Sequence, residues 1–380
     1  MARAREAFEA STDFTIGLEE EFSLLDPESL ELVHRFEELY EACLDDEVLA
    51  ESAKGELIDT EIEIRSGRGE DFADAVRLQQ MRRDRLFELC GERGVALGSV
   101  GTHPWADYRD QRIIDTPHYR RLERDLGWVA QRNNTWSMHV HVGIHGADRA
   151  VAVSDRMREL LPVLLAVSAN SPFIDGRDTG LHSVRSEIFT RTFPRCGVHQ
   201  PFGDWDTYAA FVDLLRDTGT IVEATQLWWS VRPHHHFGTV EVRICDAQTS
   251  GEESFDLAGL AAACVVQAAI DYDELGGANP PLLLDREIEE NFWRAIRYGL
   301  DGEMIDFGRG VTVPTTDVVR ATMEWAAPAA ERIGVGLHAP ELNGAQRARR
   351  ALEEGKSLEQ ILRFAVELTG ETYPTKEATK

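Results

Sequence analysis

The chain has 380 residues, 43% of them apolar, and its 40 lysine and arginine side chains stand against 67 aspartates and glutamates, a formal net charge of −27. An excess of negative charge this large argues against nucleic acid or an anionic membrane as a general partner. Five cysteines without a C-x-x-C pair are typical of a reduced, cytoplasmic protein with neither a disulfide framework nor a structural zinc.

Nothing in the sequence divides the chain or marks it for export. Its first residues are charged and lack the apolar core of a signal peptide. No apolar run approaches the roughly 20 residues that span a bilayer. There is no repeat, linker or low-complexity tract, so we predict a single domain over residues 1–380. Its sheet core would lie at about 13–250, followed by a mostly helical C-terminal part at 251–370.

The first predicted strand is residues 14–25, where apolar and polar side chains alternate with a period of two. Its apolar face would fix the register by burial, and its other face presents Glu19 and Glu21. Two residues of strand rise place these carboxylates about 7 Å apart. Carboxylates this close repel each other without a cation between them, which indicates a hard divalent metal such as Mg²⁺. Glu20 points to the apolar side, where a buried ion pair is expected.

Three later segments, at 57–65, 137–144 and 239–245, repeat this alternation. In each of them one face is aliphatic, and the other carries groups that bind metals or phosphates. These polar groups are Asp59, Glu61, Glu63 and Arg65 in the first segment, His139 and His141 in the second, and Thr239, Glu241 and Arg243 in the third. The four strands together predict a sheet with one face packed on helices and the other forming an open, charged bowl.

The remaining segments are mainly helical. Periodicity and stop signals predict helices at 71–93, 117–132, 149–169, 205–217, 251–271 and 283–298, and a short strand at 95–102. The last third, 282–370, reads almost wholly helical, and Ser357 with Gln360 forms a capping box for its last helix. Residues 170–203 are predicted to be a loop rich in arginine, proline and glycine. A loop of this length in a compact domain is usually functional.

The polar residues of the bowl favour phosphate chemistry with a metal. Carboxylates with one or two histidines suit Mg²⁺ or Mn²⁺ better than zinc, which prefers thiolate and imidazole ligands. Guanidinium groups bind phosphates and carboxylates with paired hydrogen bonds, and the candidates are Arg65, Arg185, Arg191, Arg195, Arg232 and Arg243. Metals beside arginines are the usual equipment of phosphoryl transfer. No Walker loop and no G-x-G-x-x-G turn follows a strand, which excludes the common nucleotide-binding folds at the level of motifs.

Four motifs follow one another along the chain: GLEEEF at 17–22, MHVHVG at 138–143, RP with FGTVEVR between 232 and 243, and NFWRAIRYGLDG at 291–302. Together they resemble the type 2 glutamate–cysteine ligase family of carboxylate–amine ligases. The similarity extends over nearly the whole chain. It implies an α+β fold in which a curved antiparallel β-sheet bowl is flanked by helices, as in glutamine synthetase and the guanidino kinases. It also implies an enzyme that uses ATP and Mg²⁺, or Mn²⁺, to form a γ-glutamyl amide and releases ADP and phosphate.

The resemblance assigns roles to individual residues. The metal ligands would be Glu19, Glu21, Glu56, Glu63, His139 and Glu241. Arg243, Arg185 and Arg195 would act in catalysis, and Arg65, Arg191 and Arg232 would bind ATP. The run His234–His236 departs from the family pattern and is predicted to be an exposed loop. The substrates would be glutamate and an amine such as cysteine; the identity of the amine, the number of metals and a homodimeric state are left open.

Two other classes of function fit part of the pattern. The pair His139 and His141 would suit a metal-dependent oxygenase or hydrolase of the cupin-like kind, although carboxylates outnumber histidines at the proposed site. The third class is a catalytically silent relative that binds a nucleotide or an amino acid as a regulator.

Some residues are predicted to be structural. Trp228 and Trp229 are expected in the core, and Cys196 and Cys245 are expected to be inert. Because like charges repel in a site without metal, we also expect Glu19→Gln and Glu241→Gln to raise the melting temperature of the metal-free protein.

Overall fold

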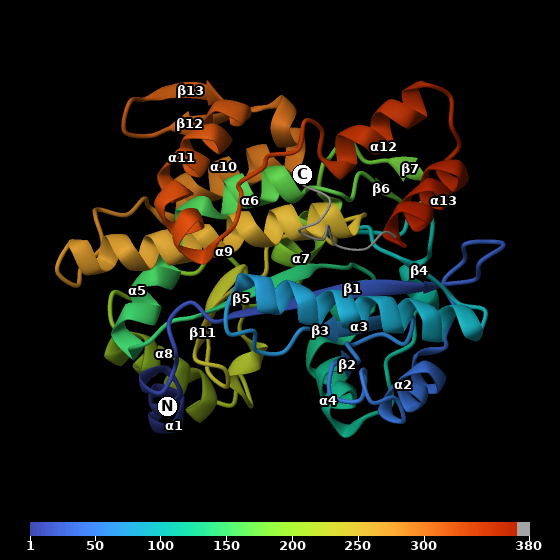
Figure 1. The fold of residues 1–380 in the computed structure, drawn as a ribbon, viewed down its shortest axis with the longest axis horizontal. Coiled ribbons are helices and arrows are strands. Elements are labelled where there is room, and N and C mark those ends of the chain that lie inside the picture. Colours follow the sequence, from blue (N-terminus) through green and yellow to red (C-terminus); the bar gives the residue numbers. More distant parts are fainter. Residues whose placement is uncertain (371–380) are drawn as a thin grey trace.

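The computed structural model describes residues 1–370, and a seven-stranded sheet lies at its centre (Figure 1). The strand order is β10-β11-β5-β1-β3-β2, and β4 also pairs with β1. All neighbours in this sheet are antiparallel. The strands are β1 (Ile16–Leu25), β2 (Ala53–Lys54), β3 (Glu61–Arg65), β4 (Ala96–Gly98), β5 (Met138–Gly143), β10 (Val231–His234) and β11 (Thr239–Val242). The sheet is not closed into a barrel, which confirms the predicted α+β fold and argues against the cupin-like alternative.

The register of the sheet gathers most of the predicted polar residues on one face. The prediction is wrong for Asp59, which precedes β3 and pairs with His34 at 2.5 Å. Glu19 of β1 lies opposite His139 of β5 and opposite Arg65 of β3. Glu241 of β11 lies opposite His141 of β5. Cross-strand partners share a face of the sheet, so residues from four strands meet there. The other face is apolar, and Leu18, Val140 and Val242 belong to one buried core with residues of the covering helices.

Several of the helices cover the apolar face (Figure 1). The helices are α1 (Ala2–Glu9), α2 (Phe36–Leu44), α3 (Phe72–Glu92), α4 (Pro117–Leu126), α5 (Ala147–Met157), α6 (Leu161–Ser168), α7 (Val184–Thr192), α8 (Trp205–Asp217), α9 (Gly251–Glu274), α10 (Asp285–Tyr298), α11 (Thr315–Ile333), α12 (Gly344–Glu353) and α13 (Leu358–Thr369). By length and composition α9 could cross a membrane, but 78% of its apolar window is buried inside the protein. Its hydrophobicity is therefore that of a core helix. The helices predicted at 71–93, 205–217, 251–271 and 283–298 are confirmed.

Glu20 is part of a buried cluster on the apolar side of β1, as its register predicted. Its carboxylate accepts hydrogen bonds from Arg83 (2.5 Å) and Gln79 (2.9 Å) of α3. The Ser254 hydroxyl of α9 donates a third bond at 2.8 Å. The cluster joins β1 to α3 and α9. A buried carboxylate needs such hydrogen-bond partners.

The predicted loop at 170–203 is wrong in part, because it contains α7 and three short strands. These strands are β6 (Phe173–Ile174), β7 (Arg177–Asp178) and β8 (Cys196–Gly197), and β8 pairs with β9 (Trp228–Trp229). The side chain of Ser183 caps α7 by accepting a hydrogen bond from the Ser186 amide. The nine residues of α7 contain only one helically spaced apolar pair, Val184 and Ile188, which is too short a pattern to predict a helix. Tertiary contacts fix this helix instead.

A hairpin and an edge strand were also missed. A hairpin of β12 (Glu303–Asp306) and β13 (Val311–Pro314) interrupts the C-terminal part that was predicted to be almost wholly helical. β10 contains Pro233, which argues against a strand in the middle of a sheet. The structure places β10 at the edge, where the missing N–H of proline costs no ladder bond. The helix predicted at 149–169 is also divided in two, because α6 begins with a proline in its first turn.

Candidate active site

The polar face of the sheet is the floor of a cavity of about 490 Å³. This volume lies within the range of about 300–1,000 Å³ that is common for small-molecule sites. Strands β1, β3, β5 and β11 supply the floor, while α4, α7 and residues 225–237 supply the walls. Every residue that the sequence assigned to the site lines this cavity, except Arg191 and Arg195.

Glu19 is the central acidic residue of the floor. Its carboxylate lies 2.8 Å from His139 Nδ1, 3.3 Å from His141 Nε2 and 3.1 Å from Arg65 Nε. Burial alone would raise the pKa of Glu19, but the charges of His141 and Arg65 outweigh it and hold the pKa well below the ordinary value. Glu19 is therefore ionised, and it contacts both the two histidines of β5 and the arginine of β3.

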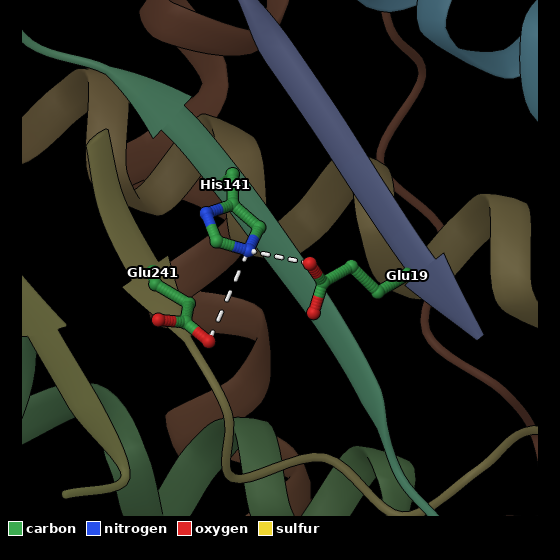
Figure 2. A group of neighbouring side chains, drawn as sticks. All are labelled: Glu19, His141 and Glu241. Atoms are coloured by element: carbon green, nitrogen blue, oxygen red, sulfur yellow. Dashed lines mark ion pairs between the residues drawn. The ribbon is translucent and has the colours of Figure 1, made fainter. Parts of the chain in front are cut away.

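Glu241 of β11 is almost completely buried, with 1% of its surface exposed. It accepts a hydrogen bond from Arg232 Nε at 2.6 Å and another from the Arg243 guanidinium. Its carboxylate also lies 3.8 Å from His141 Nε2, which faces both Glu19 and Glu241 (Figure 2). Burial would raise the pKa of Glu241, but Arg232 and Arg243 outweigh it and hold the pKa well below the ordinary value. Two arginines thus fix the charge of this carboxylate.

The carboxylates on the β3 side have the opposite electrostatics. Burial, and then the charge of Glu21, raises the pKa of Glu61 well above the ordinary value. Burial and Glu19 raise the pKa of Glu63 in the same way, although Arg65 opposes them. Burial and Glu21 raise the pKa of Glu56 to about 7. These three acids repel one another and their neighbours, so a cation among them would be stabilised.

The donor atoms of this face suit a hard divalent cation. Two groups bring their donor atoms within 4.8 Å of one another: Glu19 with His141 and Glu241, and Glu19 with Glu63 and His139. Glu61 Oε2, Glu63 Oε2 and His141 Nε2 are buried and have no hydrogen-bond partner among the described residues. Unpartnered buried oxygens are costly, and Mg²⁺ prefers carboxylate oxygens. The residues present therefore fit the metal that the family implies.

The sequence suggested that replacing Glu19 or Glu241 by glutamine would relieve repulsion between carboxylates. In the structure, Glu61 and its neighbours are the carboxylates under repulsion. Both Glu19 and Glu241 are held ionised by cationic partners, and their charges stabilise the fold. The sequence placed all carboxylates in one bowl and could not show which of them had an arginine beside it. Glu61, which the family resemblance left without a role, has only causes that raise its pKa and no cation that lowers it.

Glu61→Gln should therefore raise the melting temperature of the metal-free protein by roughly 2 °C, the shift that about 1 kcal/mol gives in a large domain. The amide cannot ionise, and it can donate a hydrogen bond toward Glu21. With a raised pKa, Glu61 keeps its proton in the folded state at a pH where the unfolded chain has lost it. Stability therefore falls as pH rises above the ordinary value of 4.5, and the advantage of the variant grows with it.

Thermal unfolding in EDTA between pH 5 and 8 measures this difference, and Mg²⁺ provides the second condition. Saturating Mg²⁺ should stabilise the wild-type protein more than Glu61→Gln, because the ion gains more from the extra charge. A wild-type protein that melts above the variant in EDTA at pH 8 would show that Glu61 is not under repulsion.

Four arginines lie on the cavity and two do not. Arg65, Arg185, Arg232 and Arg243 line it, in agreement with their predicted position. Arg191 is exposed in the last turn of α7. Arg195 Nε donates to the carbonyl oxygen of Gln226, and its guanidinium lies over the ring of Trp228. The structure does not bring Arg191 and Arg195 to the cavity.

The histidine run is only partly an exposed loop. His234 ends β10 and lines the cavity, with its ring 5.2 Å from the ring of His141. The Tyr208 hydroxyl and His235 Nε2 are hydrogen-bonded at 2.6 Å. His236 and Phe237 are exposed and also line the cavity. The run is therefore a wall of the site rather than a loop outside it.

Aromatic residues that were not predicted as part of the site form another wall of the cavity. Phe189 and Phe193 of the α7 region stack at 4.6 Å between ring centroids, and Phe193 meets Trp228 edge to face. Trp228 lines the cavity instead of lying in the core, whereas Trp229 is buried as predicted. No signal could have found Phe189 and Phe193, since they lie where a loop was predicted.

The two cysteines near the cavity are not nucleophiles. Burial raises the pKa of Cys196 and of Cys245 to about 12. Both thiols therefore keep their protons at neutral pH, as the sequence predicted.

Solved structures with the same fold are ligases. The bifunctional glutathione synthetase of Pasteurella multocida aligns with a TM-score of 0.68 at 11% identity, covering 97% of this chain and 53% of that one. The glutamate–cysteine ligase of Francisella tularensis, solved in complex with AMP, aligns with a TM-score of 0.62 at 10% identity and covers 94% and 90%. These similarities show that the chain has the fold of these enzymes.

The chain belongs to glutamate–cysteine ligase family 2, whose sequence model matches residues 15–377. A Rubrobacter xylanophilus protein named "Putative glutamate--cysteine ligase 2-2" is 41% identical over 330 residues, covering 86% of this chain and 84% of its own. A Gloeobacter violaceus protein named "Putative glutamate--cysteine ligase 2" is 36% identical, covering 93% and 96%. The resemblance seen in the four motifs is thereby confirmed.

Proposed function

We propose that this protein is an ATP-dependent carboxylate–amine ligase that forms a γ-glutamyl amide from glutamate and an amine such as cysteine. One observation carries the proposal: unpartnered carboxylate oxygens and four arginines share one cavity. The carboxylates fit Mg²⁺, and the arginines fit the phosphates of ATP and the carboxylate of an amino acid. Membership of the family supports both substrates.

The proposed roles of the residues follow from their contacts. Glu19, Glu63, His139, His141 and Glu241 would hold divalent cations, which when bound offset the negative charge of the phosphates. Arg232 and Arg243 are oriented by Glu241, so their guanidinium groups are fixed before a substrate arrives. Arg65 is fixed in the same way between Glu19 and Glu63. Phe189, Phe193 and Trp228 would reduce the access of water to the charged floor.

The chemistry would proceed in two transfers. A γ-carboxylate oxygen of glutamate bonds to the γ-phosphorus of ATP while the bond from that phosphorus to ADP breaks. The amine nitrogen then bonds to the activated carbonyl carbon, and phosphate leaves with the oxygen it took from glutamate as the amine loses a proton. Attack at the γ-phosphate suits a site with several carboxylates for metals and arginines around the transferred group. From the composition we propose that the protein is cytoplasmic and that neither nucleic acid nor a membrane is its partner.

The nucleotide product should be ADP, and glutamate labelled with ¹⁸O in its γ-carboxylate should transfer one labelled oxygen to the released phosphate. Both results follow from an acyl phosphate, because the oxygen that joins the phosphorus comes from glutamate. Nucleotide chromatography and mass spectrometry of the phosphate measure them, after a screen of ADP release over many amines has found an acceptor. AMP with pyrophosphate, or unlabelled phosphate during amide formation, would contradict this mechanism.

A further inference from the structure

Asp246 is a buried carboxylate just beyond β11, outside the set of residues assigned so far. None of its surface is exposed. It accepts hydrogen bonds from the Asn170 amide (2.9 Å), the Ser171 hydroxyl (2.7 Å) and the Ser183 hydroxyl (2.9 Å). Arg185 Nη1 lies 3.4 Å from Asp246 Oδ1. A carboxylate this deep is costly to bury, so four donors around it hold a definite arrangement.

The arrangement fixes the guanidinium of Arg185 from the side away from the cavity. Besides Asp246, its Nη1 donates to the carbonyl oxygen of Ile244 at 3.0 Å, and its Nη2 donates to that of Arg243 at 3.3 Å. Arg185 lines the cavity, and its Nε is buried without a hydrogen-bond partner among residues 1–370. One edge of the guanidinium is therefore anchored to the chain segment that follows Glu241, and its Nε remains free to donate.

Asp246 also fixes the helix that carries Arg185. The Ser183 hydroxyl gives its one proton to Asp246 and accepts a hydrogen bond from the Ser186 amide, which caps α7. The Ser171 hydroxyl likewise donates to Asp246 and accepts from the Arg185 amide at 3.1 Å. The main chain and the side chain of Arg185 are thus both placed through Asp246.

We propose that Asp246 is a positioning residue for the ligase reaction, which acts through Arg185 by holding its guanidinium against the cavity without touching a substrate itself. The proposal rests on the proposed function for the role of Arg185 toward the phosphate or carboxylate of a substrate. The placement of Arg185 by Asp246 can be measured without any activity.

The kinetic test compares Asp246→Asn, Arg185→Gln and the double variant. Asp246→Asn should lower kcat at least tenfold and change the KM for ATP less than threefold. Added to Arg185→Gln, it should change kcat/KM less than twofold, because residues that act as one unit are not additive. Asp155→Asn is the matched control: Asp155 is equally buried, accepts hydrogen bonds from the Phe202 and Gly203 amides and does not line the cavity. It should keep kcat/KM within twofold.

The second readout is the Nε–Hε cross-peak of Arg185 in protein labelled with [¹⁵N]arginine, assigned by its loss in Arg185→Gln. It should shift or broaden in Asp246→Asn and stay unchanged in Asp155→Asn. If Asp246→Asn does not fold, Ser171→Ala removes one donor from Asp246 and should shift the same cross-peak. An unchanged cross-peak, or losses that multiply in the double variant, would overturn the proposal. A wild-type protein that forms no γ-glutamyl amide with any amine tested would instead contradict the proposed function, and the cross-peak would still decide the role of Asp246.

Discussion

Glu241→Gln should abolish amide formation, with a loss in kcat/KM of at least 10³-fold, about 4 kcal/mol in transition-state stabilisation. Glu241 supplies one of the donor atoms of the possible metal-binding group with Glu19 and His141. It is also the ion-pair partner of two arginines. The amide keeps the shape but removes the charge that binds a cation and orients Arg232 and Arg243. One substitution therefore disturbs both the binding of the cation and the orientation of the two arginines.

The same variant should melt at a lower temperature than the wild-type protein, with or without Mg²⁺. Removing the charge leaves Arg232, which is 6% exposed, without its carboxylate. Breaking a buried ion pair by removing one partner costs about 3–5 kcal/mol. The direction is opposite to that expected for Glu61→Gln, so the two variants together test which carboxylates stabilise the fold and which repel.

Steady-state assays of ADP release with glutamate and the acceptor amine, together with thermal unfolding, provide both measurements. Asp155→Asn is the control for a buried carboxylate replaced away from the cavity, and it should keep its turnover. Turnover close to wild type in Glu241→Gln at ordinary Mg²⁺ would remove Glu241 from the site. A higher melting temperature would show that the two arginines do not hold its charge.

Arg243→Lys should lower kcat/KM at least 10²-fold, about 2.7 kcal/mol. Lysine keeps the positive charge but lacks the planar fork that hydrogen-bonds in two directions. Arg243 donates to Glu241 through one nitrogen, and its Nε is buried without a partner among the described residues. An ammonium group cannot reproduce both the contact with Glu241 and a second donor aimed at a phosphate.

The comparison for this variant is Arg320→Lys on α11, where the side chain is exposed and pairs with Asp317. That replacement keeps a surface ion pair and should leave kcat/KM unchanged within error. A drop of less than about threefold in Arg243→Lys would mean that Arg243 contacts neither phosphate nor carboxylate.

Much of the floor of the site could be predicted from the sequence because strand alternation is a local property. A residue's face in β1, β5 or β11 follows from its position in a period of two, so Glu19, His139 and Glu241 were assigned to one side without any structure. The family motifs added the expectation that these strands pair. The order of the strands and the pairing of Glu241 with His141 still needed the fold.

The sequence could not show which of the arginines lie on the cavity. Arg185 and Arg191 were equivalent candidates in a predicted loop, but the structure places both on α7. Six residues at about 100° each turn the second side chain about 120° away from the first, so the two cannot face one cavity. Only the helix, whose capping residue Ser183 is held by Asp246, decided which of them lies on the site.

The sequence by itself determined the acidic character of the bowl, the two faces of its strands and the kind of cation and anion they suit. The tertiary structure alone decided the state of each charge. Glu241 and Glu61 are both buried glutamates of the same face, yet the pKa of one is lowered by Arg232 and Arg243 while the pKa of the other is raised by burial and by Glu21. The difference lies in which neighbour the register brings within a few ångströms, since Coulomb interactions in a buried site depend on distance and not on composition.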